Sequence, residues 1–472
     1  MNRLQSYLTF AFLLFMVLPV DLVAQGGSAP VILSVTVNYQ STPWQITIRG
    51  RNFKPSTSVP TILFNNEPVY VPQDCTDQLV VATLTSNPNP GTFLLTMTNS
   101  KKVTGTAYLT IGAEGPPGEG WDQPVKWEVL CSAGGSVNAA LAEAGNRSSR
   151  TTFSITGFCN EDVNIERSNI TIRAADGSPD AGFNKLNLNL GAHEIRIENL
   201  RIAHGLNATD GATFRAENLR VDQPDWGSVS LSNSASGLLI NPTLTNCGCI
   251  EVQAGAYLHM NGGTLSGTSS NTAGGVSVSN GGSMDIIETV IQGLVPGLTV
   301  GTGGSVYLDH ATIENGTGDA INARGSVILF GTVIRNNNGG GIVVLPGGRA
   351  EIQWGTEISG NGSGVSVRGG VLDISNATIS DNHGPGIAVR SASSLSLGGI
   401  TLVTGNQGDG IQLGDLSFME VSGYPSTVTG NTGWGLYCSP APSVAHYTVQ
   451  YTGALDANGN TKGSISCVLA TN

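Results

Sequence analysis

Charge is scarce in this sequence. Charged residues make up 12% of the 472 residues, against roughly 25% in ordinary globular domains. The formal net charge is −12. A protein with this charge is expected to repel nucleic acid and anionic lipid rather than attract them. We therefore expect neither nucleic acid nor a membrane surface as a partner.

Long apolar runs are missing as well, with one exception near the N-terminus. Residues 8–20 are apolar and follow Arg3. A membrane helix needs ~20 apolar residues, so this run is too short to span a bilayer comfortably. Its layout is that of a signal peptide with cleavage near residue 24. The sequence predicts a signal peptide at residues 1–24, no membrane span, and a secreted or cell-surface protein.

Short motifs of known chemistry are absent too. The sequence contains no Gly-x-Ser-x-Gly, no His-Glu-x-x-His and no phosphate-binding loop, which are the patterns of esterases, zinc proteases and nucleotide-binding enzymes. Cys247-Gly248-Cys249 has no further Cys or His at ligand spacing, so we expect no metal site.

What the sequence does contain is glycine, 64 residues of it, and an internal repeat. A phrase of the form apolar-x-x-Asn/Gly, followed by Gly-apolar-x-apolar, recurs about every 22 residues, and each period holds three short strands. Its first apolar residue falls at Ile202, Val221, Leu244, Leu265, Ile291, Ile313, Ile334, Ile358, Ile379, Val403 and Val428.

Strands this short bury nothing alone, but stacked turns ~4.8 Å apart share one apolar core. We expect about eleven turns over residues 169–438, an N-terminal cap at 123–168 and a C-terminal cap at 439–472. The core should include Leu308, Leu329, Ile352, Ile374, Leu397, Ile313, Ile334 and Ile379. Asparagines three residues after the markers should hydrogen-bond to one another along the stack, namely Asn337, Asn361, Asn382, Asn406 and Asn431.

This repeat resembles the right-handed parallel β-helix of the pectin-lyase-like superfamily over residues 123–472. The resemblance implies an all-β fold, but not an activity, since that fold hosts lyases, hydrolases, epimerases, adhesins and inert spacers. The paired aspartates and Arg-x-Lys of the polygalacturonase-like hydrolases are absent here, as is the Asp-Pro-His-Glu of alginate epimerases.

Residues 29–112 have a different pattern, with short alternating strands separated by turns. Segments 46–53, 61–64, 91–93 and 106–111 resemble an IPT/TIG immunoglobulin-like module, which implies a spacer or adhesion role. The Gly/Pro-rich segment 113–122 predicts a linker.

The seven cysteines allow disulfides in an exported protein. Cys131 and Cys159 bracket one small unit, and Cys438 and Cys467 bracket another, so we predict these two bridges. Cys75, Cys247 and Cys249 are interpreted as small buried apolar residues.

Enzymes of this superfamily work along one sheet face, which directs attention to the outward residues of the first strand in each turn. That outward column should read Arg196, Arg215, Leu238, His259, Asp285, Tyr307, Ile328, Glu351, Asp373, Ser396 and Glu420. Glu351 and Asp373 would lie one turn apart, ~5 Å from each other, with Arg349 on the same face. Contacts to sugar are expected from Tyr307, Asp309, Gln353 and Trp354.

Two hypotheses remain open. In the first, the chain is a non-catalytic protein that binds a polysaccharide or cell-surface glycan, or mediates adhesion. In the second, it is a polysaccharide lyase or glycoside hydrolase in which Glu351 and Asp373 are the carboxylates and Arg349 is the base. The first requires no cofactor, whereas a lyase would use Ca²⁺ between the carboxylates.

Overall fold

The computed structural model describes residues 30–38, 43–54, 58–73, 75–86, 91–111, 125–144, 150–222, 228–246, 249–267, 274–414, 416–422, 424–439, 448–451 and 455–467. The expected signal peptide at 1–24, the linker at 113–122 and Cys247 lie outside these residues.

The N-terminal part consists of two small antiparallel sheets around their own core, and we refer to it as the N-terminal sandwich (residues 31–111). One sheet has the order β1 (Val31–Asn38), β2 (Gln45–Arg51) and β5 (Leu79–Thr83). The other has the order β4 (Glu67–Pro68), β3 (Thr61–Phe64), β6 (Gly91–Thr98) and β7 (Thr104–Ile111). Alternation along β2 buries Ile46 and Ile48 and leaves Arg49 exposed.

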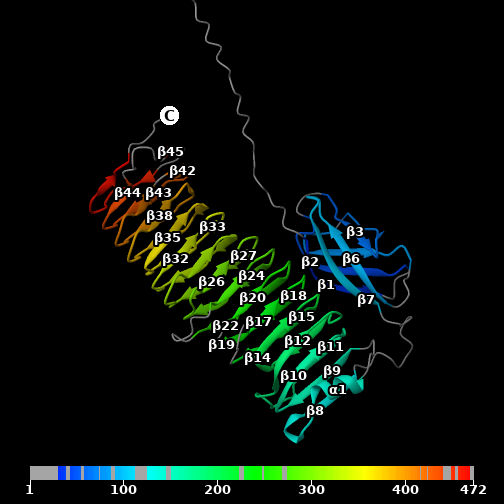
Figure 1. The fold of residues 1–472 in the computed structure, drawn as a ribbon. Coiled ribbons are helices and arrows are strands. Elements are labelled where there is room, and N and C mark those ends of the chain that lie inside the picture. The colour runs from blue at the N-terminus through cyan, green and yellow to red at the C-terminus, as the bar shows by residue number, and fades with distance from the viewer. Residues whose placement is uncertain are drawn as a thin grey trace, which may run out of the picture.

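The described residues from Val125 onward form a right-handed parallel β-helix of about 13 turns (Figure 1). Its first sheet has 15 strands, all parallel, and carries the outward column. These strands are β8 (Val125–Leu130), β9 (Thr151–Thr156), β11 (Ile170–Ala174), β13 (Ile195–Glu198), β15 (Thr213–Glu217), β18 (Ser236–Ile240), β21 (Tyr257–Asn261), β24 (Ser283–Ile287), β27 (Ser305–Asp309), β30 (Ser326–Phe330), β33 (Arg349–Gln353), β36 (Val371–Ser375), β39 (Ser394–Gly398), β42 (Phe418–Ser422) and β45 (Thr448–Tyr451).

A 25-stranded sheet runs along the other sides of the coil, with strands stacked in two rows such as β25–β28–β31 and β26–β29–β32. Its members are β10 (Phe158–Ile165), β12 (Gly182–Leu188), β14 (Arg201–Ala208), β16 (Arg220–Val221), β17 (Val229–Leu231), β19 (Thr243–Thr245), β20 (Ile250–Val252), β22 (Thr264–Ser266), β23 (Val276–Val278), β25 (Val290–Gln292), β26 (Leu298–Val300), β28 (Thr312–Glu314), β29 (Ile321–Ala323), β31 (Val333–Arg335), β32 (Gly340–Val344), β34 (Glu357–Ser359), β35 (Ser363–Arg368), β37 (Thr378–Ser380), β38 (Ile387–Arg390), β40 (Leu402–Thr404), β41 (Ile411–Leu413), β43 (Ser426–Thr429), β44 (Trp434–Cys438), β46 (Leu455–Asp456) and β47 (Gly463–Ile465).

The coil is longer than the eleven turns expected from the repeat. β8, β9 and β10, which the sequence assigned to a cap, already pair within the two long sheets, and β45 to β47 continue them beyond residue 438. The C-terminal turn carries Asn460 three residues after Ala457, in line with the repeat, but its strands lie beyond the bound of 438 expected from the sequence.

The stacked turns share one apolar core, and every core residue predicted from the repeat is at most 2% exposed. The asparagine ladder is also present: the Nδ2 of each residue donates to the Oδ1 of the next at 2.8–3.2 Å, and the ladder continues to Asn460. The second sheet is therefore held by buried side-chain bonds in addition to its backbone ladder.

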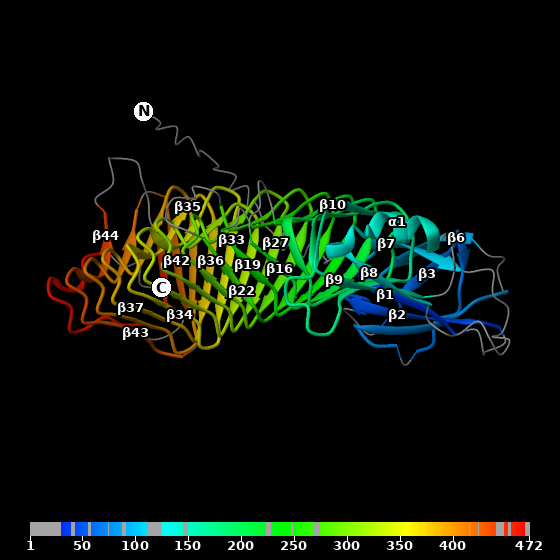
Figure 2. The same ribbon diagram turned by 90° about the horizontal axis from the view of Figure 1, so that it is seen from below.

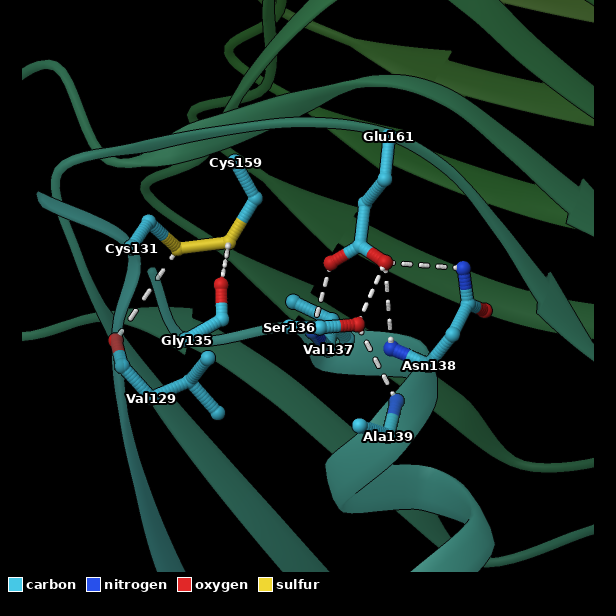
Figure 3. The surroundings of a disulfide bond; sticks show 9 residues. All are labelled: Val129, Cys131, Gly135, Ser136, Val137, Asn138, Ala139, Cys159 and Glu161. Carbon is cyan, nitrogen blue, oxygen red and sulfur yellow. Dashed lines mark hydrogen bonds between the residues drawn. A yellow bond between two sulfur atoms is a disulfide. The ribbon is translucent and has the colours of Figure 1, made fainter. Parts of the chain in front are cut away.

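The first turn is closed by α1 (Val137–Ala144) and a short 3₁₀ helix, η1 (Cys131–Ala133). Ser136 Oγ accepts a hydrogen bond from the Ala139 N–H at 3.1 Å, and the Glu161 carboxylate accepts from the Val137 N–H at 2.5 Å and Ser136 Oγ at 2.7 Å (Figure 3). A carboxylate at this helix end satisfies donors that the helix itself leaves unpaired.

Disulfides join Cys131 to Cys159 and Cys438 to Cys467, with Cα–Cα distances of 4.9 and 5.0 Å. Each bridge lies at one end of the coil (Figure 3 shows the first). Cys249, interpreted from the sequence as a plain buried residue, is also disulfide-bonded. Cys75 is buried and is not part of a disulfide.

The sandwich lies against the N-terminal half of the coil, with β1 in contact with β18 of the first sheet (Figures 1 and 2). Among the described residues, nothing comparable covers the first sheet from β33 to β42 (Figure 1). The sandwich thus divides the outward column into a covered and an open part.

Candidate functional site

The outward column exists as the sequence predicts. Each of its members pairs in register with the next, from Arg196 to Glu420. Glu351 on β33 therefore lies directly beside Asp373 on β36.

Arg349 connects these two carboxylates. Its Nη2 lies 2.8 Å from Asp373 Oδ2 and 3.9 Å from Glu351 Oε2. Gln353, two residues further along β33, donates its amide to Glu351 Oε1. We call these four residues the arginine cluster. The Arg349–Asp373 contact is a close ion pair, the Arg349–Glu351 contact is longer, and all four residues lie on the open part of the sheet.

The protonation state of the cluster follows from its surroundings. Burial raises the pKa of Asp373, and the neighbouring Glu351 charge adds to this, while Arg349 opposes it. Arginine stays protonated in proteins, and here the Arg349 guanidinium is held by the Asp373 carboxylate.

Two hollows flank the cluster. One, of about 410 Å³, is lined by Glu351, Gln353, Asp373, Ser375 and Ser396 among others. The second, of about 350 Å³, is lined by Arg349, Val371, Ser394, Leu416 and Phe418 together with several glycines and small residues.

Trp354 immediately follows β33 and is 60% exposed. An exposed indole offers an apolar ring face with a polar N–H at its edge.

The other predicted ligand residues lie on β27, with β30 between them and the cluster. Burial raises the pKa of Tyr307, and Asp309 adds to this effect through its charge and a hydrogen bond. Asp309 also bonds His310 Nδ1 at 2.5 Å. The structure thus spreads the predicted residues along one face and gathers only Arg349, Glu351, Asp373 and Gln353 into a cluster.

Sequence reasoning missed a second cluster on the covered part of the column. Arg51 of the sandwich forms an ion pair with both carboxylate oxygens of Asp285, and its Cζ lies 4.2 Å from the centroid of the Tyr257 ring. The Tyr257 hydroxyl donates to Asp285 Oδ2 at 2.6 Å, and His259 Nδ1 lies 3.5 Å from the same oxygen. We call these four residues the interdomain cluster.

Its electrostatics favour the ion pair. Burial opposes ionisation of Asp285, but the His259 hydrogen bond and the Arg51 charge outweigh it, so the pKa of Asp285 lies below its usual value. Burial raises the pKa of Tyr257, and the Asp285 charge raises it further. Only His259 and Asp285 were visible in the sequence, as members of the column, because no local pattern places Arg51 against a strand more than 200 residues away.

Within the described residues, no group of three or more His, Cys, Asp and Glu side chains is arranged to hold a metal ion. No helix in the same part of the chain is long and apolar enough to cross a membrane.

Comparisons with known proteins bear on the fold. A family model described as "Right handed beta helix region" matches residues 320–465. No curated protein matches the sequence.

Similar solved structures include the A-module of a mannuronan C-5 epimerase from Azotobacter vinelandii, at 10% identity and a TM-score of 0.41 over 71% of this chain and 93% of that chain. They also include the catalytic unit of an alpha-1,3-glucanase from Streptomyces thermodiastaticus, at 12% identity and a TM-score of 0.47 over 90% of each chain. Residues 320–465 are therefore a right-handed β-helix region by sequence as well as by structure.

Proposed function

We propose that this protein is secreted or held at the cell surface, and that it binds a polysaccharide on the open part of the first sheet without cleaving it. The observation that carries the proposal is the arginine cluster, whose charges are paired with one another beside open hollows and an exposed Trp354. Such a surface offers fixed donors and acceptors to sugar hydroxyls and an apolar ring to a sugar face.

The charge of this face favours a neutral polysaccharide. Besides Arg349, it carries the carboxylates Glu351, Asp373 and Glu420. A polyanionic chain would be repelled by this excess of negative charge as well as by the net charge of −12.

A second candidate function is glycoside hydrolysis, favoured by the raised pKa of Asp373 next to Glu351. Paired carboxylates with separated pKa values are the usual machinery of that reaction. Against it stands the contact of Arg349 with both carboxylates, because its positive charge opposes the raised pKa of Asp373.

Affinity electrophoresis tests the proposal. The purified protein should migrate more slowly in gels that contain xyloglucan, galactomannan or dextran, and at unchanged rate in gels that contain polygalacturonate. A Trp354→Ala variant should lose the retardation, whereas the matched variant Tyr70→Ala, at an exposed aromatic of the sandwich, should retain it.

The same polysaccharides are then assayed for new reducing ends and for unsaturated products. We expect neither. Products that disappear in a Glu351→Gln, Asp373→Asn double variant would establish the hydrolase or lyase in place of the binding protein.

A further inference from the structure

Two polar residues of the first sheet are buried although their positions face outward. Asp285 belongs to the outward column, and Tyr257 lies two residues before His259 of the same column, so both side chains project away from the coil. Tyr257 is nonetheless 3% exposed and Asp285 6% exposed. A sheet face that is open from β33 to β42 is thus shielded at β21 and β24.

The N-terminal sandwich provides the shield, and it does so through a polar contact. Arg51, at the end of β2, reaches the carboxylate of Asp285 and the face of the Tyr257 ring. A contact centred on an ion pair and a cation–π interaction differs from the apolar packing inside each domain. Interfaces between domains that are small and polar favour relative motion.

Arg51 occupies the groups that a sugar would use. The ring face of Tyr257 is a stacking surface, and the Asp285 oxygens are acceptors for hydroxyl groups. All of these are engaged by Arg51 or by one another in the docked state. When the sandwich moves away, water can solvate them, because they lie on the outer face of the coil.

We propose that Tyr257, His259 and Asp285 are a masked extension of the polysaccharide-binding face, and that the N-terminal sandwich is a removable cover fastened by the Arg51–Asp285 ion pair. His259 and Asp285 continue the column of Tyr307 and Glu351, one turn after another, and Tyr257 lies on the neighbouring outward column. Their role in binding rests on the proposed function, whereas the cover itself does not.

Nitration of tyrosine tests the cover without any ligand. In the wild-type protein, tetranitromethane should nitrate the exposed Tyr70 and Tyr424 and leave Tyr257 unmodified. Arg51→Ala should expose Tyr257 to nitration, as measured by peptide mass spectrometry. Arg49→Ala, which removes an exposed arginine of the same strand, should leave Tyr257 protected.

A second variant, Asp285→Asn, removes the coil's partner in the ion pair. It should also make Tyr257 accessible to nitration. Circular dichroism establishes that each variant is folded. The proposal of a removable cover is overturned if both variants are folded and Tyr257 remains as protected from nitration as in the wild type.

The masked extension is tested by affinity electrophoresis in xyloglucan, with Arg51→Ala compared with Arg49→Ala. The first should be retarded more strongly than the wild type and the second equally. An Arg51→Ala protein that exposes Tyr257 yet is retarded no more than the wild type overturns the masked extension. If the wild-type protein itself binds no neutral polysaccharide, the proposed function fails while the nitration result still decides whether the cover exists.

Discussion

Arg51 and Asp285 stand 234 residues apart in the chain and form the ion pair that fastens the sandwich to the first sheet of the coil. Breaking one partner of a buried pair leaves the other charge uncompensated, which is costly unless the structure opens and admits water. The pair therefore determines how much of the outward column is available at the surface, and it links the position of the sandwich to the polysaccharide-binding face.

This ion pair should make docking sensitive to acid. Because the pKa of Asp285 is lowered in the folded protein, its contribution is fully present above the unfolded value of 3.8 and is lost as the pH falls through the lower folded value. Small-angle scattering should show the sandwich separating only in that acidic range. The other titratable groups facing Asp285 are Arg51, Tyr257, His259 and Tyr307.

The control for this prediction is the Asp285→Asn variant. Separation of its sandwich from the coil should no longer depend on pH in the acidic range. A transition at the same acidic pH in this variant would assign the effect to another group.

The arginine cluster makes its own prediction. Arg349→Ala removes the charge that opposes the raised pKa of Asp373 and leaves Glu351 beside it unneutralised. We expect affinity for the retained neutral polysaccharide to fall about tenfold or more, equivalent to about 1.4 kcal/mol. Arg368→Ala, an exposed arginine of β35 on the other sheet, is the control. Equal affinities for the two variants would contradict the placement of the site.

The asparagine ladder should be a major source of stability. Asn382 is fully buried, accepts from the Asn361 backbone N–H at 3.0 Å and donates to Asn406 Oδ1 at 2.9 Å. Asn382→Ala leaves these partners unpaired, at about 1–3 kcal/mol for each buried group. Urea unfolding should show a loss of roughly 3 kcal/mol, whereas the exposed neighbour His383→Ala should change stability by about 0.5 kcal/mol or less. Similar losses of unfolding free energy in Asn382→Ala and His383→Ala would contradict a stabilising role of the ladder.

The N-terminal cap makes a smaller, local prediction. Glu161→Ala removes the acceptor of the Val137 N–H and of Ser136 Oγ, and should lower stability by about 1–2 kcal/mol. Glu143→Ala, an exposed glutamate near the other end of α1, should not lower it, because a negative charge there is unfavourable for the helix dipole. The comparison is made by hydrogen exchange of the α1 amides, and equal protection in the two variants would argue against the cap.

The fold was accessible from the sequence because its rules are local and repeated. Ile313, Ile334 and Ile379 recur at one period, and the alternation around Glu351 and Asp373 fixes which side chains face outward. The last turn continues the asparagine ladder to Asn460, yet the sequence assigned it to a cap because it lies beyond Cys438. The contact of Arg349 with both carboxylates depends on side-chain torsions, and the Arg51–Asp285 pair depends on how two domains dock, and neither is encoded in a period or an alternation.

Carbodiimide labelling of carboxylates tests the central claim most directly. Glu351 and Asp373 should be labelled in the free protein and protected when xyloglucan or galactomannan is bound, with no shortening of the polysaccharide. Glu357, an exposed glutamate of β34 on the other sheet, should be labelled equally in both conditions. Equal labelling of Glu351, Asp373 and Glu357 with and without a polysaccharide that the protein demonstrably binds, or the appearance of cleavage products, would contradict the account.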